Sequence, residues 1–310
     1  MRYSGIGGQA VMEGVMMKNQ DRYAVAVRKP DKEISVEAFD YEGLIKNKTL
    51  KNAPILRGVV NFIDSLVLGM RTLTYSASFF EEEEAGKEEK IAKNSEKKEK
   101  VQMGFTVLLS IVMAVAIFMI LPYYLSLLFE RYVASPTILA LIEGLIRLAV
   151  FIGYILLISC MEDIRRVFMY HGAEHKCINC IEHGMQLNVE NVKKSSRQHK
   201  RCGTSFLLFV MIVSIVFFAF IRVDSGILRV VLRLVLIPVV AGVSYEFIRI
   251  AGRSENVAVE LLSKPGLWLQ KLTTKEPDDE MIEVGIASVE AVFDWRTYLK
   301  ETGKENNQES

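Results

Sequence analysis

Four long apolar segments in the middle of the chain constrain its fold most strongly. An α-helix rises about 1.5 Å per residue, so about 20 apolar residues suffice to cross the hydrocarbon core of a bilayer. The segments that meet this length are residues 103–129, 137–161, 203–221 and 227–252. The positive mean hydropathy of the whole chain, +0.22, is also typical of membrane proteins. The sequence therefore predicts a mainly α, polytopic membrane protein with four transmembrane helices.

The basic residues beside these segments predict the orientation of the chain. Between the second and third segments lie eight of them: Arg165, Arg166, Lys176, Lys193, Lys194, Arg197, Lys200 and Arg201. The two short turns, residues 131–136 and 222–226, carry only Arg131 and Arg222. Cytoplasmic loops carry an excess of Lys and Arg. We therefore expect this loop and both termini to lie in the cytoplasm of a multi-pass cell-membrane protein.

The whole chain divides into five predicted parts. These are an N-terminal cytoplasmic β-containing element (1–53), an amphipathic helix (54–80), a charged linker (81–101), the membrane core (102–252) with a cytoplasmic His/Cys loop (162–202), and a C-terminal cytoplasmic segment (253–310). Residues 23–28 and 34–39 are β-leaning runs around a turn-forming Lys-Pro-Asp-Lys sequence and predict a hairpin. The Gly-rich residues 5–17 predict a buried strand or a small sheet. We thus expect a small N-terminal α/β element, and a C-terminal cytoplasmic helix over residues 279–298.

Charged residues inside the apolar segments need partners, since an Arg at a membrane helix centre costs about 2.5–3.5 kcal/mol. Glu143 and Arg147 lie four residues apart and can pair on one helix. Arg229 and Arg233 begin the fourth segment and are expected to reach the interface. Glu246, near its cytoplasmic end, is a possible additional ligand or hydrogen-bond partner for a metal site in the neighbouring loop.

Residues 170–206 hold all four histidines and three of the four cysteines of the chain. Imidazole and thiolate groups bind borderline-soft metal ions. Because the cytoplasm keeps thiols reduced, a disulfide framework is not expected. The loop is the part of the sequence where chemistry is concentrated.

The sequence allows three metal-site arrangements in this loop. The H-x-x-E-H motif places His171 and His175 on one helix face as ligands, with Glu174 as the general base for an activated water, although Gly172 weakens that helix by about 1 kcal/mol. Cys177, Cys180, His199 and Cys202 have the spacing of a structural zinc knuckle. The third arrangement combines His171 and His175 with His199 and Cys202. The remaining alternative is that these side chains only cap helices and pack near lipid headgroups.

Several motifs along most of the chain together resemble the YqhQ-like family of bacterial integral membrane proteins, an uncharacterised family described as metal-dependent enzymes. They are GQAVMEGVMM at 8–17, RG at 57–58, HGAEHK at 171–176, RCGTSF at 201–206, YE at 245–246, PGLW at 265–268 and EP at 276–277. The family pattern lacks the Cys177/Cys180 pair. The resemblance therefore implies the metal set His171, His175, His199 and Cys202.

The leading functional hypothesis is a metal-dependent hydrolase, with zinc as the expected ion, acting at the cytoplasmic membrane surface. Glu174 would activate water for attack on a peptide or lipid-linked substrate. The alternative is a non-enzymatic assembly factor that binds other membrane proteins, such as a translocon or an insertase, and uses the metal only as a structural element. A transporter is a third, weaker hypothesis. Besides these, the expected partner is the lipid bilayer; no nucleic-acid partner is expected.

Overall fold

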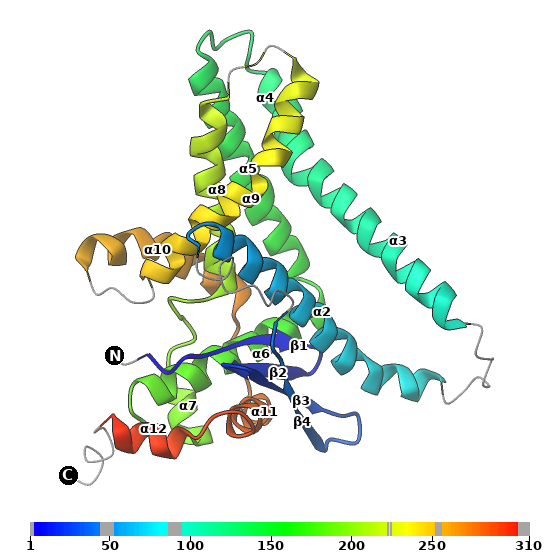
Figure 1. Cartoon of the computed structure of the whole chain (residues 1–310), viewed down its shortest axis with the longest axis vertical. Helices are drawn as coiled ribbons and strands as arrows, with labels where there is room; N and C mark the ends of the chain where they lie inside the picture. The colour runs from blue at the N-terminus through cyan, green and yellow to red at the C-terminus, as the bar shows by residue number, and fades with distance from the viewer. Residues whose placement is uncertain are drawn as a thin grey trace.

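The chain forms two layers of different character, which Figure 1 shows from the side. In this computed structural model the described residues are 3–43, 53–85, 95–221, 223, 225–251 and 256–302. Long helices form the upper layer, and a small sheet covered by helices forms the lower layer. Residues 86–94 of the predicted linker, Arg222, and residues 303–310 of the predicted C-terminal segment lie outside the described residues.

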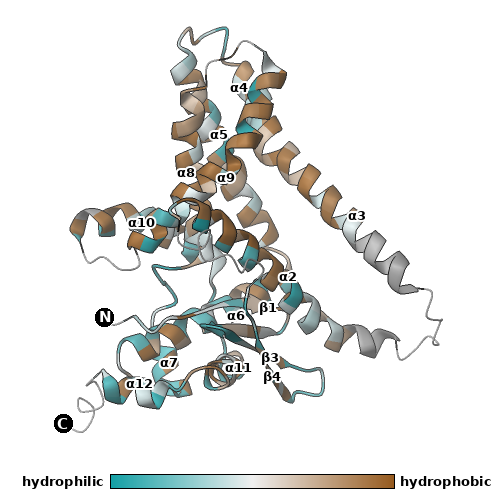
Figure 2. Ribbon diagram, viewed as in Figure 1, coloured by the Kyte–Doolittle hydropathy of each residue, from teal (hydrophilic) through white to brown (hydrophobic). Residues whose placement is uncertain are grey.

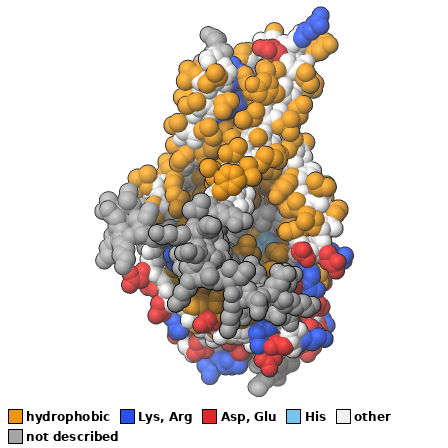
Figure 3. Space-filling view, turned by 90° about the vertical axis from the view of Figure 1, so that its right-hand side faces the viewer, with side chains coloured by type: hydrophobic (Ala, Val, Ile, Leu, Met, Phe, Trp, Pro, Cys, Tyr) orange, Lys and Arg blue, Asp and Glu red, His pale blue; other side chains and the backbone are white. Residues whose placement is uncertain are grey.

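The upper layer consists of the apolar segments. Its elements are α3 (Ser95–Val115), the π-helix η1 (Ala116–Ile120), α4 (Leu121–Leu127), α5 (Pro136–Ile158), α8 (Gly203–Ala219) and α9 (Gly226–Ala251). Three stretches are long and apolar enough to cross a membrane, namely Gly104–Leu127, Pro136–Ile158 and Gly226–Ala251, and α8 is a shorter apolar helix. Hydrophobic residues cover this layer in Figures 2 and 3, whereas charged side chains gather on the lower one. The predicted class, a mainly helical protein with the helices of a multi-pass membrane protein, is confirmed.

Pro122 explains the π-helical turn in the first apolar stretch. It is buried in the first turn of α4, directly after η1. Proline has no N–H to donate, and its ring collides with the carbonyl group four residues earlier in a regular helix. The wider turn of η1 changes the hydrogen-bond pattern at this point, so the chain continues as a helix through the proline.

A buried ion cluster joins three of the apolar helices. Glu143 on α5 accepts hydrogen bonds from Arg147 (2.7 Å) and from both Nη atoms of Arg233 on α9 (2.6 and 2.7 Å). Arg147 also donates to Ser214 on α8 (3.1 Å). The predicted pair within α5 is confirmed. The expectation that Arg233 reaches the interface is wrong: its planar fork matches the Glu143 carboxylate, and it is only 3% exposed.

The N-terminal residues form a four-stranded antiparallel sheet in the order β1-β2-β3-β4. The strands are β1 (Ile6–Val11), β2 (Gly14–Asn19), β3 (Arg22–Arg28) and β4 (Ile34–Asp40). In the predicted hairpin, formed by β3 and β4, Arg28 lies opposite Ile34. Two-residue turns precede β2 and β3, and they place Glu13 and Gln20 at positive φ (48° and 53°), as tight hairpin turns require. The predictions of a hairpin and of a small sheet are both confirmed.

Helices from distant parts of the sequence cover this sheet. One face packs against α6 (Glu162–Glu182) and α11 (Asp279–Glu290), and the other packs against α2 (Leu56–Ala85). The short helices α7 (Val189–Lys194) and α12 (Trp295–Glu301) complete the lower layer, and α10 (Val257–Thr273) precedes α11. The predicted single helix over residues 279–298 is two helices, because Asp294 caps a new one by accepting the Thr297 N–H.

Helix α2 lies across the base of the apolar layer and contacts α9. Gly58 and Gly242 bring the two backbones together, since a Cβ on Gly58 would lie 2.9 Å from the Gly242 Cα atom. Arg57 makes an ion pair with Glu246 through two hydrogen bonds. The RG and YE motifs of the sequence thus join these helices.

Gly172→Ala should destabilise the fold, although alanine favours a helix by about 1 kcal/mol. The added Cβ would lie 2.0 Å from the Lys275 carbonyl oxygen, so α6 would have to move away from the segment after α10. We expect a loss of about 1–3 kcal/mol in the free energy of unfolding, measured as a lower Tm of the detergent-purified protein.

Gly153→Ala is the matched control for this variant, because nothing lies within 4 Å of its added Cβ. Its Tm should be unchanged or higher. Equal Tm values for the two variants would contradict the close contact at Gly172.

Candidate metal centre

Helix α6 carries the H-x-x-E-H motif in its buried second half. Of residues 170–182, all but His171 are buried. Residues four positions apart share one helix face, so His171 and His175 point to the same side. Strand β1 covers the neighbouring Glu174, where a Cβ on Gly8 would lie 2.9 Å from the Glu174 Cγ atom. Gly8, which lacks a side chain, therefore allows β1 to lie close to Glu174 on α6.

Main-chain carbonyl groups fix the tautomer and orientation of both imidazoles. His171 Nδ1 lies 2.9 Å from the Thr273 carbonyl oxygen, and His175 Nδ1 lies 2.6 Å from that of Arg197. A carbonyl oxygen only accepts, so each Nδ1 carries a hydrogen and donates it. Each Nε2 of the neutral ring then keeps a lone pair. This is the arrangement that metal-binding histidines use.

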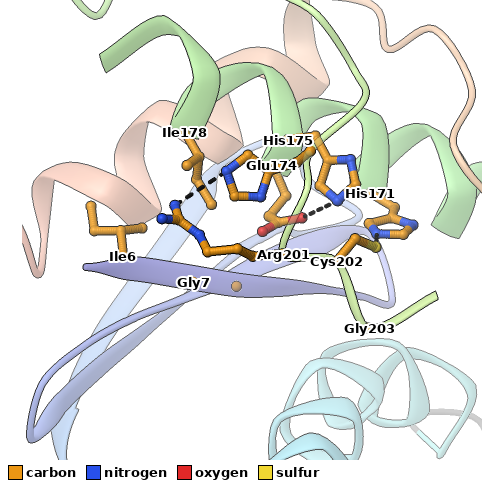
Figure 4. Close-up of a pocket in the computed structure, with 11 residues that line it drawn as sticks. Ile6, Gly7, His171, Glu174, His175, Ile178, Arg201, Cys202 and Gly203 are labelled. Atoms are coloured by element: carbon orange, nitrogen blue, oxygen red, sulfur yellow. Dashed lines mark hydrogen bonds and ion pairs between the residues drawn. The ribbon is translucent and has the colours of Figure 1, made fainter. Parts of the chain in front are cut away.

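Cys202 brings a sulfur to these two nitrogen atoms. It is the N-cap of α8, where its Sγ accepts the Thr204 N–H, and it lies 3.3 Å from His171 Nε2. One ligand atom each from His171, His175 and Cys202 lie within 4.8 Å of one another, as the close-up in Figure 4 illustrates. Within the described part of the chain, this is the group of His, Cys, Asp or Glu side chains that is close enough to hold one metal ion.

The electrostatics of the three side chains favour the thiolate. Burial alone would raise the pKa of the Cys202 thiol, but the imidazoles of His171 and His175 hold it well below its usual value. Burial would also lower the pKa of His175, but the Glu174 carboxylate and Cys202 raise it to about 9. A thiolate and neutral imidazoles are the ligating forms, so metal binding here must release protons from the imidazoles.

Glu174 lies in the same cavity as the ligand atoms. This cavity has a volume of about 100 Å³ and is lined by β1, α6 and the segment that leads into α8. The Glu174 Oε2 atom lies 3.4 Å from His175 Nε2. Pockets for drug-sized ligands have volumes of about 300–1,000 Å³. The cavity is therefore large enough for a reacting group but not for a whole large substrate.

His199 lines this cavity, but its imidazole belongs to a neighbouring network. Gln270 of α10 binds both the main-chain N–H and the carbonyl of His199 (2.8 and 2.7 Å). His199 Nε2 lies 3.4 Å from Glu182 and 3.2 Å from Arg201, which also donates to Glu182. Burial would raise the pKa of Glu182, but His199 and Arg201 lower it to about 2. The described metal group thus consists of three of the four predicted ligands, with His199 beside it.

The other candidate ligands lie elsewhere. Cys177 packs against α11, where a Cβ on Gly285 would lie 3.0 Å from its Sγ. Cys180 contacts a main-chain carbonyl oxygen, and burial raises its pKa to about 11. Glu246, on α9, is ion-paired with Arg57 of α2. The described residues therefore do not assemble the four-ligand zinc knuckle, and Glu246 does not join the metal group.

Glu182, Gln270 and Thr273 were not predicted as site residues from the sequence, and Arg201 was noted only as a basic residue and as the first residue of the RCGTSF motif. Gln270 and its partner His199 are 71 residues apart, and Thr273 and its partner His171 are 102 residues apart. The local signal for Arg201 is its position next to Cys202. For the others a single sequence offers no comparable signal, because their roles depend on how α10 packs.

The fold and the site define a mainly helical protein with long apolar helices and a His/His/Cys group. Comparison with known proteins shows the family to which it belongs. The model of the family described as "Protein of unknown function (DUF1385)" matches residues 53–295, and the chain belongs to that family. Over 288 residues it is 38% identical to the "Uncharacterized protein YqhQ" of Bacillus subtilis (strain 168), with 91% of this chain and 90% of that protein covered. The resemblance read from the motifs is therefore confirmed. No solved structure matches the chain.

Replacing any one of the three ligands should remove the metal. We expect about one zinc per chain in wild-type protein purified without chelators, and little in His171→Ala, His175→Ala or Cys202→Ser, by elemental analysis. His199→Ala should retain zinc, because its Nε2 faces Glu182 and Arg201.

Two controls accompany this prediction. His183→Ala, at an exposed position, and Cys177→Ser/Cys180→Ser should both keep the metal. A wild-type protein that takes up no zinc, and in which Cys202 is alkylated rapidly in a His171-dependent way, would contradict the metal site. It would indicate a thiolate–imidazolium pair instead.

Proposed function

We propose that this protein is a zinc-dependent hydrolase whose active site lies at the cytoplasmic surface of the membrane. The observation that carries the proposal is the convergence of two imidazole nitrogens and one sulfur on the cavity that holds Glu174. Structural zinc sites use four protein ligands, whereas catalytic sites use three and leave one position open. Three ligands beside a carboxylate therefore support a catalytic site.

The donor set fits zinc better than it fits hard cations. His171 and His175 offer nitrogen and Cys202 offers a thiolate, whereas Mg²⁺ and Ca²⁺ prefer oxygen ligands. When bound there, a zinc ion supplies Lewis acidity, which polarises a carbonyl or phosphoryl oxygen and makes water more acidic. The two main-chain carbonyls that hold the imidazoles supply the orientation such a site needs.

Glu174 is the residue that moves the proton in this proposal. Its carboxylate lies 3.4 Å from His175 Nε2, so a water beside the ligand atoms is within its reach. A carboxylate oxygen takes the proton as the water attacks and returns it to the leaving group. Such general acid–base catalysis contributes about 10²–10⁴-fold. Because the cavity admits only a reacting group, we infer a peptide or lipid-linked substrate whose remaining part stays outside.

We further infer that α8 completes a core of four transmembrane helices, with the His/Cys loop and both termini in the cytoplasm. The 17 residues of α8 give a length of about 26 Å, close to the hydrocarbon thickness of about 30 Å. The basic residues of the loop support this orientation.

A cysteine placed in the turn between α4 and α5 should be labelled from outside the cell. Tyr132 in this turn is exposed, so Tyr132→Cys, in a Cys160→Ser background, should react with a membrane-impermeant maleimide on intact cells. Lys193→Cys on α7 is the matched control and should react only after permeabilisation. The reverse pattern would contradict the proposed orientation.

Glu174→Gln should abolish hydrolysis while zinc stays bound. The amide keeps the size of the side chain but cannot take up the proton. We expect zinc-loaded wild-type protein in micelles to cleave at least one of an ester, an amide and a phosphodiester reporter. The rate of that cleavage should be at least about 100-fold lower in Glu174→Gln.

Glu190→Gln, which changes an exposed carboxylate on α7, is the matched control and should keep full activity. Zinc analysis of the same samples separates loss of the base from loss of the metal. Wild-type turnover by the zinc-loaded Glu174→Gln protein would rule out this role.

A non-enzymatic assembly factor is the second candidate, and one observation favours it. Ile63, Leu66, Met70 and Leu73 form an exposed apolar stripe on α2. A stripe of this spacing fits a helix of another membrane protein, such as a translocon or an insertase subunit, as well as lipid. In this account the metal only stabilises the fold. Zinc-loaded wild-type protein would then cleave none of the reporters, and removing the ligands would lower Tm.

A further inference from the structure

Helix α10 has two faces of opposite character. Its inner face is buried and includes Leu269, Gln270 and Thr273. Its outer face exposes three large apolar side chains, Val257 (79%), Leu261 (62%) and Trp268 (52%), and Leu262 (54%) is exposed at one side of the helix. Exposed apolar side chains this numerous on one helix indicate a surface that something covers.

The inner face of α10 holds the residues around the metal group. Gln270 accepts a hydrogen bond from the main-chain N–H of His199 and donates to the His199 carbonyl oxygen. It also donates to Ser205 Oγ (2.7 Å). The Thr273 carbonyl at the end of the helix accepts the His171 Nδ1–H. Gly266 lets α10 contact the first turn of α8, since a Cβ there would lie 2.8 Å from Ser205 Oγ. The helix therefore fixes the metal group relative to whatever covers its outer face.

The position of α10 indicates what covers its outer face. The helix runs sideways from the base of the apolar layer, at the level where α8 begins, and not into the charged lower layer (Figure 1). Its outer turns carry hydrophobic residues, as the neighbouring apolar helices do (Figure 2). The exposed apolar side chains of α10 thus belong to a helix that packs against α8 and α9 at the base of the apolar layer.

The polar residues of α10 have the arrangement of an interfacial helix. At 100° per residue, Lys264 and Lys271 lie along one edge of the face that Trp268 and Leu261 occupy, and both lysines are exposed. Lysine at such an edge can reach lipid phosphates, and tryptophan is enriched at the level of the headgroups. Helices of this kind lie in the plane of the interface with their apolar face in the outer part of the acyl region.

We propose that α10 is an interfacial membrane anchor. Its outer face lies in the headgroup region of the leaflet that is next to the His/Cys loop. Its occupant is lipid, because the apolar face lies at the base of the apolar layer, beside α8 and α9, and is edged by lysines. The inner contacts of α10 then hold the cavity at headgroup depth. This anchoring does not depend on metal chemistry.

One consequence rests on the proposed function. A cavity held at headgroup depth selects substrates that present their reacting bond at that depth. A lipid-linked substrate, cleaved near its headgroup, meets this requirement directly.

The two tryptophans of the chain allow a direct test on the full protein. Trp268 lies on the outer face of α10, whereas Trp295 is buried in the lower layer and donates to Glu290. The zinc-loaded protein is placed in vesicles of phosphatidylcholine and phosphatidylglycerol, with bromine atoms either near the headgroup or near the chain ends. Bromine quenches tryptophan fluorescence only at short range, so quenching reports depth.

Trp295→Phe isolates the Trp268 signal, and we expect strong quenching by the shallow bromines and several-fold weaker quenching by the deep ones. Trp268→Phe isolates the Trp295 signal, which should be nearly unquenched in both vesicles. If Trp295→Phe fails to fold, subtracting the Trp268→Phe signal from wild type gives the same quantity.

Two results would overturn the proposal. If Trp268 is quenched no more than Trp295, lipid does not cover α10. If the deep bromines quench Trp268 most, the helix inserts into the hydrocarbon core and is not interfacial. Neither result bears on zinc content or on Glu174, so failure of the anchor and failure of the proposed hydrolase remain distinguishable.

Discussion

Two hydrogen bonds to main-chain carbonyls hold the His/His/Cys group in its arrangement. The carbonyls of Arg197 and Thr273 each accept an imidazole Nδ1–H, which turns both Nε2 atoms towards Cys202. Without these hydrogen bonds the imidazoles could rotate, and the two Nε2 atoms would no longer both face Cys202. These carbonyls belong to the segment before α8 and to the end of α10, so the site requires α6, α8 and α10 to pack together.

That packing places the centre at the boundary between the two layers of the molecule. Cys202 directly precedes α8, an apolar helix, while Glu174 lies under the first strand of the sheet. The resulting cavity is small, polar and adjacent to the surface that meets lipid. An enclosed carboxylate beside convergent ligands at such a boundary suits chemistry on a group presented from the membrane, which is why we favour a hydrolase over a purely structural site.

The features predictable from the sequence are those that local physics determines. Apolar length predicted the long helices, and two β-leaning runs around turn residues predicted the β3–β4 hairpin. The four-residue spacing of His171 and His175 predicted that they share one helix face. Arg233 and His199 show the limit of this reasoning. Arg233 pairs with Glu143 on another helix, and the placement of His199 depends on Gln270, 71 residues later. Such partners become visible only after the helices have packed.

X-ray absorption spectroscopy at the zinc edge of the detergent-purified protein distinguishes an open three-ligand site from a closed one, because the spectrum depends on the identity of the ligand atoms. For zinc held by His171, His175 and Cys202 we expect two nitrogen ligands at about 2.0–2.1 Å, one sulfur at about 2.3 Å and one further light atom in the open position. Cys177→Ser/Cys180→Ser should leave this spectrum unchanged, because neither sulfur belongs to the His/His/Cys group. Two or more sulfur ligands in the wild-type spectrum would contradict the three-ligand site. Such a spectrum would favour the closed zinc knuckle of Cys177, Cys180, His199 and Cys202.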